Sequence, residues 1–170
     1  LAVILRNKEG KNQVTVYPGV TLEESDLPVF FQEGFDSDFL LLNQEIPEKV
    51  LMNTMTWAQS NNIKIILNPT PVTSFTKQLS QKAWLITPNW HEVREMFALD
   101  GINQVEDLIN VLPNLGFSRM VVTLGDKGAF VLEKGIVTHL PALKVKAVDT
   151  TGAGDVFNAA LVVGLGEKMT

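Results

Sequence analysis

The sequence has 170 residues, 45% of them hydrophobic and 19% charged, which is typical of one α/β domain with a sizeable core. A net charge of −5 argues against nonspecific binding to nucleic acid, and no apolar run is long enough to span a bilayer. The absence of cysteine excludes a disulfide framework, and two histidines are too few for a typical zinc centre. We expect a cytoplasmic protein with no nucleic-acid or membrane partner.

The chain begins with a hairpin pattern, in which a polar turn at residues 7–11 joins two apolar runs. Strand and helix signals then alternate three times, which predicts an α/β fold with a mostly parallel central sheet and helices on both faces. The expected strands lie at residues 1–6, 13–17, 39–42, 63–67, 84–86, 120–124, 129–132 and 136–140. The expected helices lie at residues 23–31, 47–62, 74–81, 89–97 and 105–115, with a buried helix at 158–165.

Polar clusters follow several of the expected strands, where ligands bind in sheets of this kind. Each cluster alone is explained by turn chemistry, because Asn, Pro and Gly dominate loops. Their common placement favours a ligand site. The clusters are residues 43–45, 68–71 and 87–92, and the glycine-containing loop after Leu124.

One stretch, residues 148–157, organises the chain. The small residues Gly152, Ala153 and Gly154 permit a sharp turn, and the helix expected after them would present unpaired amides and its positive dipole end to an anion. Asp155 falls in the first helical turn, where a carboxylate is either a favourable dipole partner or a general base beside a ligand. Local physics leaves these two interpretations equally open.

Two other phosphate-binding loops are excluded. A Walker loop needs Gly-Lys-Ser/Thr after a first glycine and four residues, and no such run occurs. A dinucleotide-binding fingerprint needs a third glycine where this sequence has Phe157. A metalloprotease helix is also excluded, because Glu95 stands where the second histidine after His91 is required.

The run Asp149-Thr-Thr-Gly-Ala-Gly-Asp-Val-Phe157 resembles the signature D-T-x-G-A-G-D-x-F of the ribokinase-like (pfkB) carbohydrate kinases, and matches it at every specified position. The resemblance implies a three-layer α/β/α fold. It also implies that Asp155 is the general base for a sugar hydroxyl, and that the backbone of Gly152, Ala153 and Gly154 forms the anion hole.

Two further motifs extend the resemblance. Asn89 and Glu92 match the family's N-x-x-E motif, which implies that they support the magnesium and phosphate region through water. Local physics would make them only a helix cap and its capping-box partner. The run Thr123-Leu-Gly-Asp-Lys-Gly128 resembles the family's T-L-G-x-x-G nucleotide loop, although a β-turn between two strands would look the same. The resemblance implies these nucleotide-binding residues: Asn89, Thr123, Gly125, Asp126, Lys127, Gly128 and Gly154.

The segments around residues 42–47 and 66–71 look more like ribokinases than like fructokinases or ketodeoxygluconate kinases. This likeness implies that Glu45 contacts sugar hydroxyls, whereas locally Glu45 would only favour the dipole of the following helix. Asp149 and Thr151 match the positions that hold a monovalent cation, normally potassium. The implied cofactors are Mg²⁺ and K⁺, with ATP as co-substrate.

The resemblance covers the whole chain, but the family's fold is nearly twice as long. We therefore expect residues 1–170 to be the nucleotide-binding α/β domain of a sugar kinase truncated at both ends, with residues 1–17 a remnant of the sheet next to the lid. The implied reaction is transfer of phosphate from ATP to the primary hydroxyl of ribose, in an intact parent that we expect to be a homodimer. The alternatives are a related kinase acting on fructose, another pentose or a nucleoside, and a non-catalytic nucleotide-binding fragment.

Overall fold

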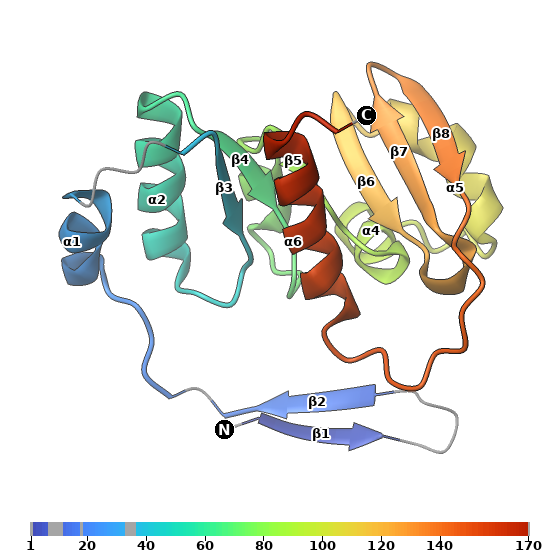
Figure 1. Ribbon diagram of the computed structural model, residues 1–170, viewed down its shortest axis with the longest axis horizontal. Coiled ribbons are helices and arrows are strands. Elements are labelled where there is room, and N and C mark those ends of the chain that lie inside the picture. The colour runs from blue at the N-terminus through green and yellow to red at the C-terminus, as the bar shows by residue number, and fades with distance from the viewer. Residues whose placement is uncertain (1, 7–11, 18, 33–36, 170) are drawn as a thin grey trace.

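The computed structural model describes residues 2–6, 12–17, 19–32 and 37–169, which contain two separate sheets (Figure 1). The smaller sheet is the expected hairpin, in which β1 (Ala2–Arg6) pairs antiparallel with β2 (Asn12–Val16). Its turn at residues 7–11 lies outside the described residues.

The larger sheet has six strands in the order β3-β4-β5-β6-β7-β8. The first four strands are parallel, as the alternation of strand and helix signals predicted. The last two are antiparallel, because turns too short for a crossover join β6 to β7 and β7 to β8. The strands are β3 (Phe39–Leu42), β4 (Lys64–Leu67), β5 (Leu85–Ile86), β6 (Arg119–Thr123), β7 (Ala129–Glu133) and β8 (Ile136–Leu140).

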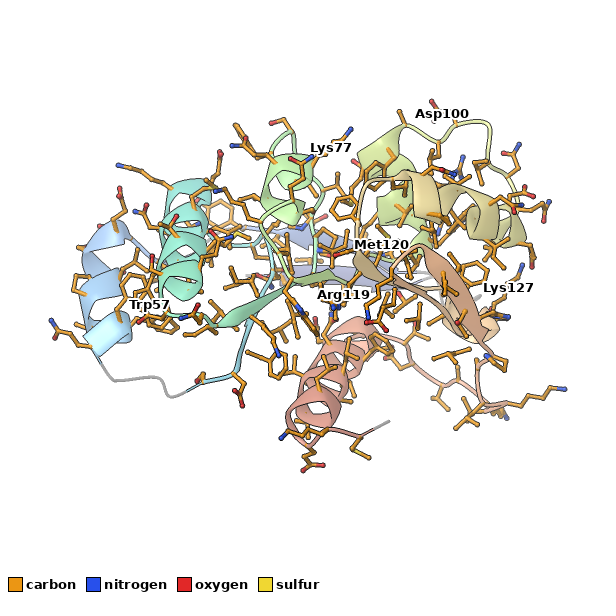
Figure 2. The ribbon with its side chains drawn as sticks, turned by 90° about the horizontal axis from the view of Figure 1, so that it is seen from above. Trp57, Lys77, Asp100, Arg119, Met120 and Lys127 are labelled. Atoms are coloured by element: carbon orange, nitrogen blue, oxygen red, sulfur yellow. The ribbon has the colours of Figure 1, made fainter. Side chains whose placement is uncertain are left out.

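One face of this sheet carries most of the helices (Figure 2). Strand residues such as Ile65 and Leu67 point toward them and pack with Leu51 and Met55 in the main core cluster. The connecting helices are α2 (Glu48–Ser60), α3 (Thr76–Ser80), α4 (Trp90–Phe97) and α5 (Leu108–Val111). Before β3, a 3-10 turn η1 (Glu24–Asp26) leads into α1 (Leu27–Gln32), which packs against α2.

The opposite face carries α6 (Ala153–Gly166) (Figure 2). Ile66 points to this face, as the two-residue period of a strand requires, and packs with Leu85 and Val121. Phe157 and Leu161 of α6 complete this second cluster. Helices therefore lie on both faces of the sheet, in three layers.

Two helical expectations need correction. The segment expected as one helix at residues 105–115 is divided into η2 (Val105–Asp107), α5 and η3 (Leu112–Asn114), with Pro113 inside the last of these. The helix expected to be buried is exposed on its outer side, where Val156 and Val163 are 70% and 58% exposed. Apolar residues lie on both sides of this helix, but within the described chain it packs against the sheet on one side. None of the described helices has the length and apolarity needed to cross a membrane.

Candidate active site

The start of α6 has the sharp turn that the sequence predicted. Gly152 adopts the left-handed conformation, with φ +73°, and is the N-cap of the helix. Because glycine has no side chain, no capping oxygen accepts a hydrogen bond from the first-turn amides. The Ala153 amide donates to Thr150 O at 3.1 Å, so it is engaged in the turn itself. The amides of Gly154 and Asp155 therefore belong to a helix end without a side-chain cap.

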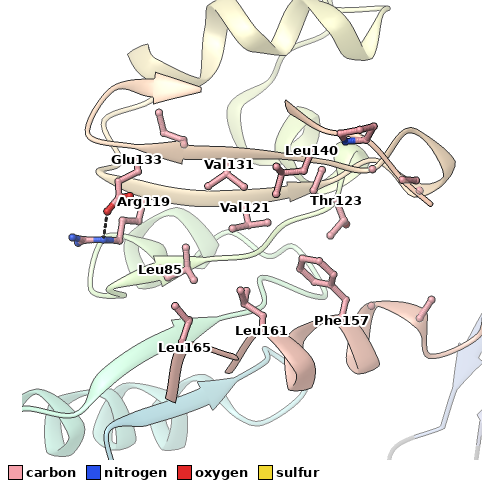
Figure 3. Close-up of a pocket in the computed structure, with 18 of the residues that line it drawn as sticks. Leu85, Arg119, Val121, Thr123, Val131, Glu133, Leu140, Phe157, Leu161 and Leu165 are labelled. Atoms are coloured by element: carbon pink, nitrogen blue, oxygen red, sulfur yellow. Dashed lines mark ion pairs between the residues drawn. The ribbon is translucent and has the colours of Figure 1, made fainter. Parts of the chain in front are cut away.

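A cavity of about 990 Å³ lies between α6 and the sheet. Figure 3 shows Phe157, Leu161 and Leu165 projecting into it from the helix, opposite Val121 and Val131 of the sheet. One end is bounded by Arg119 and Glu133, an ion pair with an N–O distance of 3.5 Å. The other end brings together residues from both glycine-containing motifs: Thr123, Gly125, Gly128, Ala153 and Gly154.

The loop after β6, residues 125–128, is shaped by its two glycines. Gly125 and Gly128 have φ of +63° and +95°, which most side chains do not tolerate. Gly128 also passes so close to the chain after β8 that a Cβ there would lie 2.0 Å from Leu140 O. Residue 128 must therefore be glycine, both because its φ is positive and because a Cβ would clash with the backbone of Leu140.

Lys127 points away from the cavity, to Glu106 of η2. Its Nζ lies 2.9 Å from Glu106 Oε1, and this hydrogen bond is the main reason that the pKa of Glu106 is lowered from its ordinary value. The cavity lining includes neither Lys127 nor Asp126. Within the loop, the two glycines are therefore the residues that face the cavity.

Asn89 and Glu92 lie at the next strand end. The Asn89 side chain accepts from Glu92 N and the Glu92 side chain accepts from Asn89 N, which is the expected capping box at the start of α4. Asn89 also lies beside Thr123 in a parallel bridge, because Thr123 N donates to Pro88 O. The N-x-x-E motif is thereby joined to the strand that leads into the 125–128 loop.

Glu92 is 9% exposed, and its carboxylate is engaged on both oxygens. Oε2 accepts from Asn89 N at 2.8 Å, and Oε1 lies 2.5 Å from Thr70 Oγ1. Thr70 Oγ1 is also 3.0 Å from Asn68 Oδ1, but a hydroxyl has one proton, and Glu92 is the nearer acceptor. Thr70, which follows β4, thus connects two neighbouring strand ends.

The remaining predicted residues lie outside the cavity lining. Glu45 is exposed just beyond β3, and its backbone amide donates to Asn43 Oδ1 at 3.2 Å. Asp149 Oδ1 accepts from Thr151 N at 2.9 Å, in the exposed segment before α6. Asp155 is exposed in the first turn of α6.

Two residues of this region were missed from the sequence. Thr70 belongs to a polar cluster that was noted, but nothing in its local pattern signals that its hydroxyl reaches a residue 22 positions away. His139 lies on β8, and its Nε2 is 2.8 Å from Lys127 O. No sequence signal could have found it, because the contact depends on how β8 pairs with β7.

The side chains available as ligands limit which metal ions could bind. In the described part of the chain, no cluster of three or more His, Cys, Asp or Glu side chains could hold a metal ion. Mg²⁺ does not need one, because it usually binds through one or two carboxylates, waters and substrate phosphates. Since both Glu92 oxygens already accept protein hydrogen bonds, this carboxylate is suited to holding a hydrated ion through water.

Comparison with known proteins assigns the whole chain to a family. Residues 1–170 match the pfkB family carbohydrate kinases. The ribokinase of Lactococcus lactis is 32% identical over 161 residues, covering 94% of this chain and 51% of the relative. The ribokinase of Bacillus subtilis is 31% identical over 163 residues, covering 94% and 53%. The chain thus spans about half the length of the curated relatives it matches.

Solved structures agree with this assignment. The crystal structure of ribokinase from Thermotoga maritima matches with a TM-score of 0.76 and 35% identity, over 98% of this chain and 56% of that one. Ribokinase from Giardia lamblia shares the fold, with a TM-score of 0.82 at 20% identity, over 98% and 56%. The chain belongs to the pfkB family of carbohydrate kinases and has a ribokinase-like α/β/α fold.

Proposed function

We propose that the polypeptide carrying this chain is an ATP-dependent ribokinase, which transfers the γ-phosphoryl group of ATP to the primary hydroxyl of ribose. The observation that carries the proposal is that one cavity is lined by Gly125 and Gly128 of the 125–128 loop and by Ala153 and Gly154 of α6. Backbone there can approach phosphates from two sides without side chains in the way. The ribokinases among the relatives supply the substrate class.

Asp155 would act as the general base. It would accept the proton of the sugar hydroxyl as the hydroxyl oxygen attacks the γ-phosphate in line. Its position in the first turn of α6 supports this role, because the residue is exposed and adjoins a helix end without a side-chain cap.

The amides at the start of α6 would form the anion hole. Gly154 and Asp155 N are the strongest candidates, because the N-cap glycine leaves this end without a side-chain cap. Gly152 contributes through its left-handed turn, and Ala153 through the bond of its amide to Thr150 O, which holds the turn in place. Preformed donors of this kind stabilise charge as it develops on the transferred phosphoryl group.

Two cations complete the proposal. Mg²⁺ would neutralise the phosphate oxygens, and Glu92, fixed by Asn89 and Thr70, would orient its waters. Asp149 and Thr151 would supply part of a potassium site beside the anion-binding turn. Two residues of one turn do not enclose such an ion, so further ligands would have to complete the site. Glu45 would bind sugar hydroxyls from the end of β3.

The test is a substrate screen on the whole polypeptide that carries this chain, with ADP release as the readout. The expected result is turnover with ribose that exceeds turnover with fructose or a nucleoside. A second arm uses 2-deoxyribose, because a deoxyribokinase of Salmonella typhi is 25% identical over 162 residues. No sugar-dependent ADP release with any of these acceptors would overturn the proposal.

A further inference from the structure

Within the 125–128 loop, Lys127 makes two polar contacts with residues outside the loop. Its carbonyl oxygen lies 2.8 Å from His139 Nε2, and its ammonium group lies 2.9 Å from Glu106 Oε1. His139 is on β8 and Glu106 is on η2, so two separate elements hold the loop. Neither residue lines the cavity.

Both contacts are exposed, and they differ in what fixes the side chain that makes them. The Lys127–Glu106 pair is exposed, and such pairs contribute little because water and salt screen them. The His139 ring packs edge-on against Phe130, with centroids 5.1 Å apart and planes at 60°. Because Phe130 is only 4% exposed on the neighbouring strand β7, this packing fixes the direction in which the imidazole points.

The rest of the loop is already tightly bonded. Leu124 N donates to Gly128 O at 2.8 Å, and Gly128 N donates to Gly125 O at 3.1 Å. These bonds tie the loop to the adjoining ends of β6 and β7, and the His139 contact adds a further hold from β8.

We propose that His139 is a positioning residue that holds the 125–128 loop against β8, so that Gly125 and Gly128 face the nucleotide. This inference rests on the proposed function, since it assumes that the loop binds ATP. It does not make His139 a ligand of ATP. The imidazole acts through the Lys127 carbonyl.

The contact specifies a tautomer. A carbonyl oxygen only accepts hydrogen bonds, so Nε2 of His139 must carry the proton. Both the neutral Nε2–H form and the imidazolium meet this requirement, whereas the neutral Nδ1–H form does not. The Nε2–H form should therefore be the neutral tautomer, and nitrogen chemical shifts of the histidine ring report it directly.

Three substitutions separate the hydrogen bond from the packing. His139→Phe keeps a ring against Phe130 and removes the donor, and His139→Ala removes both. His139→Gln restores an N–H donor of similar reach. Thermal unfolding checks that each variant is folded.

The measurements are the Kd for ADP with Mg²⁺, the KM values for ATP and for the sugar, and amide exchange of residues 125–128. His139→Phe should weaken ADP binding and raise the KM for ATP by about 3- to 10-fold, the size of one neutral hydrogen bond. The KM for the sugar should stay unchanged, and His139→Gln should recover part of the loss. Loop amides should exchange faster in His139→Phe without nucleotide.

The outcomes distinguish this inference from the proposed function. If the wild-type protein binds ADP and His139→Phe binds it equally well, the positioning role is wrong and the kinase proposal stands. If the wild-type protein does not bind ADP, the kinase proposal fails, and amide exchange still tests whether His139 holds the loop. A neutral Nδ1–H tautomer, or equal exchange rates in both proteins, would overturn the inference.

Discussion

Replacing Thr70 with valine tests whether the end of β4 holds the carboxylate of Glu92. Valine has nearly the shape of threonine and lacks only the hydroxyl, which lies 2.5 Å from Glu92 Oε1. The substitution therefore removes one hydrogen bond from the carboxylate of a residue that is 9% exposed. Thr70→Ser is the matched control, because serine keeps the hydroxyl and loses a methyl group.

The magnitude follows from the partners of Glu92. A hydrogen bond to a charged group contributes about 1.5–3 kcal/mol, and leaving a buried acceptor unpaired incurs a similar cost. Glu92 Oε2 would still accept from Asn89 N, so the lower part of this range applies. We expect Thr70→Val to lower the free energy of unfolding by about 1.5–2 kcal/mol, and Thr70→Ser by less than about 1 kcal/mol.

Urea unfolding of the polypeptide that carries this chain measures both values, and a double-mutant cycle with Glu92→Ala isolates the interaction. The expected coupling energy is about 1–2 kcal/mol, within the range for residues that share a hydrogen bond. Equal destabilisation by valine and serine, or a coupling energy near zero, would show that the hydroxyl does not hold Glu92.

Three further predictions concern the neighbouring features. If Asp149 and Thr151 bind potassium, replacing it with sodium or lithium should lower the rate, and equal rates in all three salts would leave them as turn residues. Gly128→Ala should destabilise the protein by about 2–4 kcal/mol in urea unfolding, since its Cβ would clash with a carbonyl. Gly135→Ala is the control, because its φ is also positive but its Cβ would meet no atom, so it should destabilise the protein less than Gly128→Ala. Equal destabilisation by the two variants would show that the clash at residue 128 does not matter. The lowered pKa of Glu106 means that its lysine pair stabilises the fold above the ordinary glutamate pKa. That small contribution is lost as pH falls through the folded pKa, so Glu106→Gln should slightly flatten the acid-side decline in stability; a steeper decline in the variant would refute this.

Local patterns were sufficient to predict most of the elements. The capping box of Asn89 and Glu92 starts α4 as expected, and Pro47 immediately precedes α2. The run Phe39–Leu42 forms the strand β3 that its apolar character predicted. In each case the deciding interactions lie within a few residues of one another.

Predictions that depended on distant neighbours succeeded less well. The apolar residues of α6 suggested burial, but burial requires a partner on each side, and Val163 has none within the described chain. Pro113 lies inside η3, so the helical spacing of residues 105–115 does not continue as a single α-helix.

In the candidate site, too, local features could be predicted from the sequence and long-range contacts could not. The φ of Gly152 and Gly128 could be anticipated, because glycine in such loops usually marks an unusual backbone conformation. That Lys127 would turn toward Glu106 could not be anticipated, since 21 residues separate them and a whole strand lies between. The contact of His139 with the Lys127 carbonyl depends likewise on strand pairing.

The most direct test of the account is Asp155→Asn in the whole polypeptide that carries this chain. Asparagine keeps the size of the side chain and cannot take up a proton, so kcat for ribose phosphorylation should fall by roughly 10²- to 10⁴-fold. The Kd for ADP with Mg²⁺, measured by calorimetry, should stay within about twofold, because the backbone amides remain in place. A kcat close to that of the wild-type protein would contradict the assignment of Asp155 as the general base.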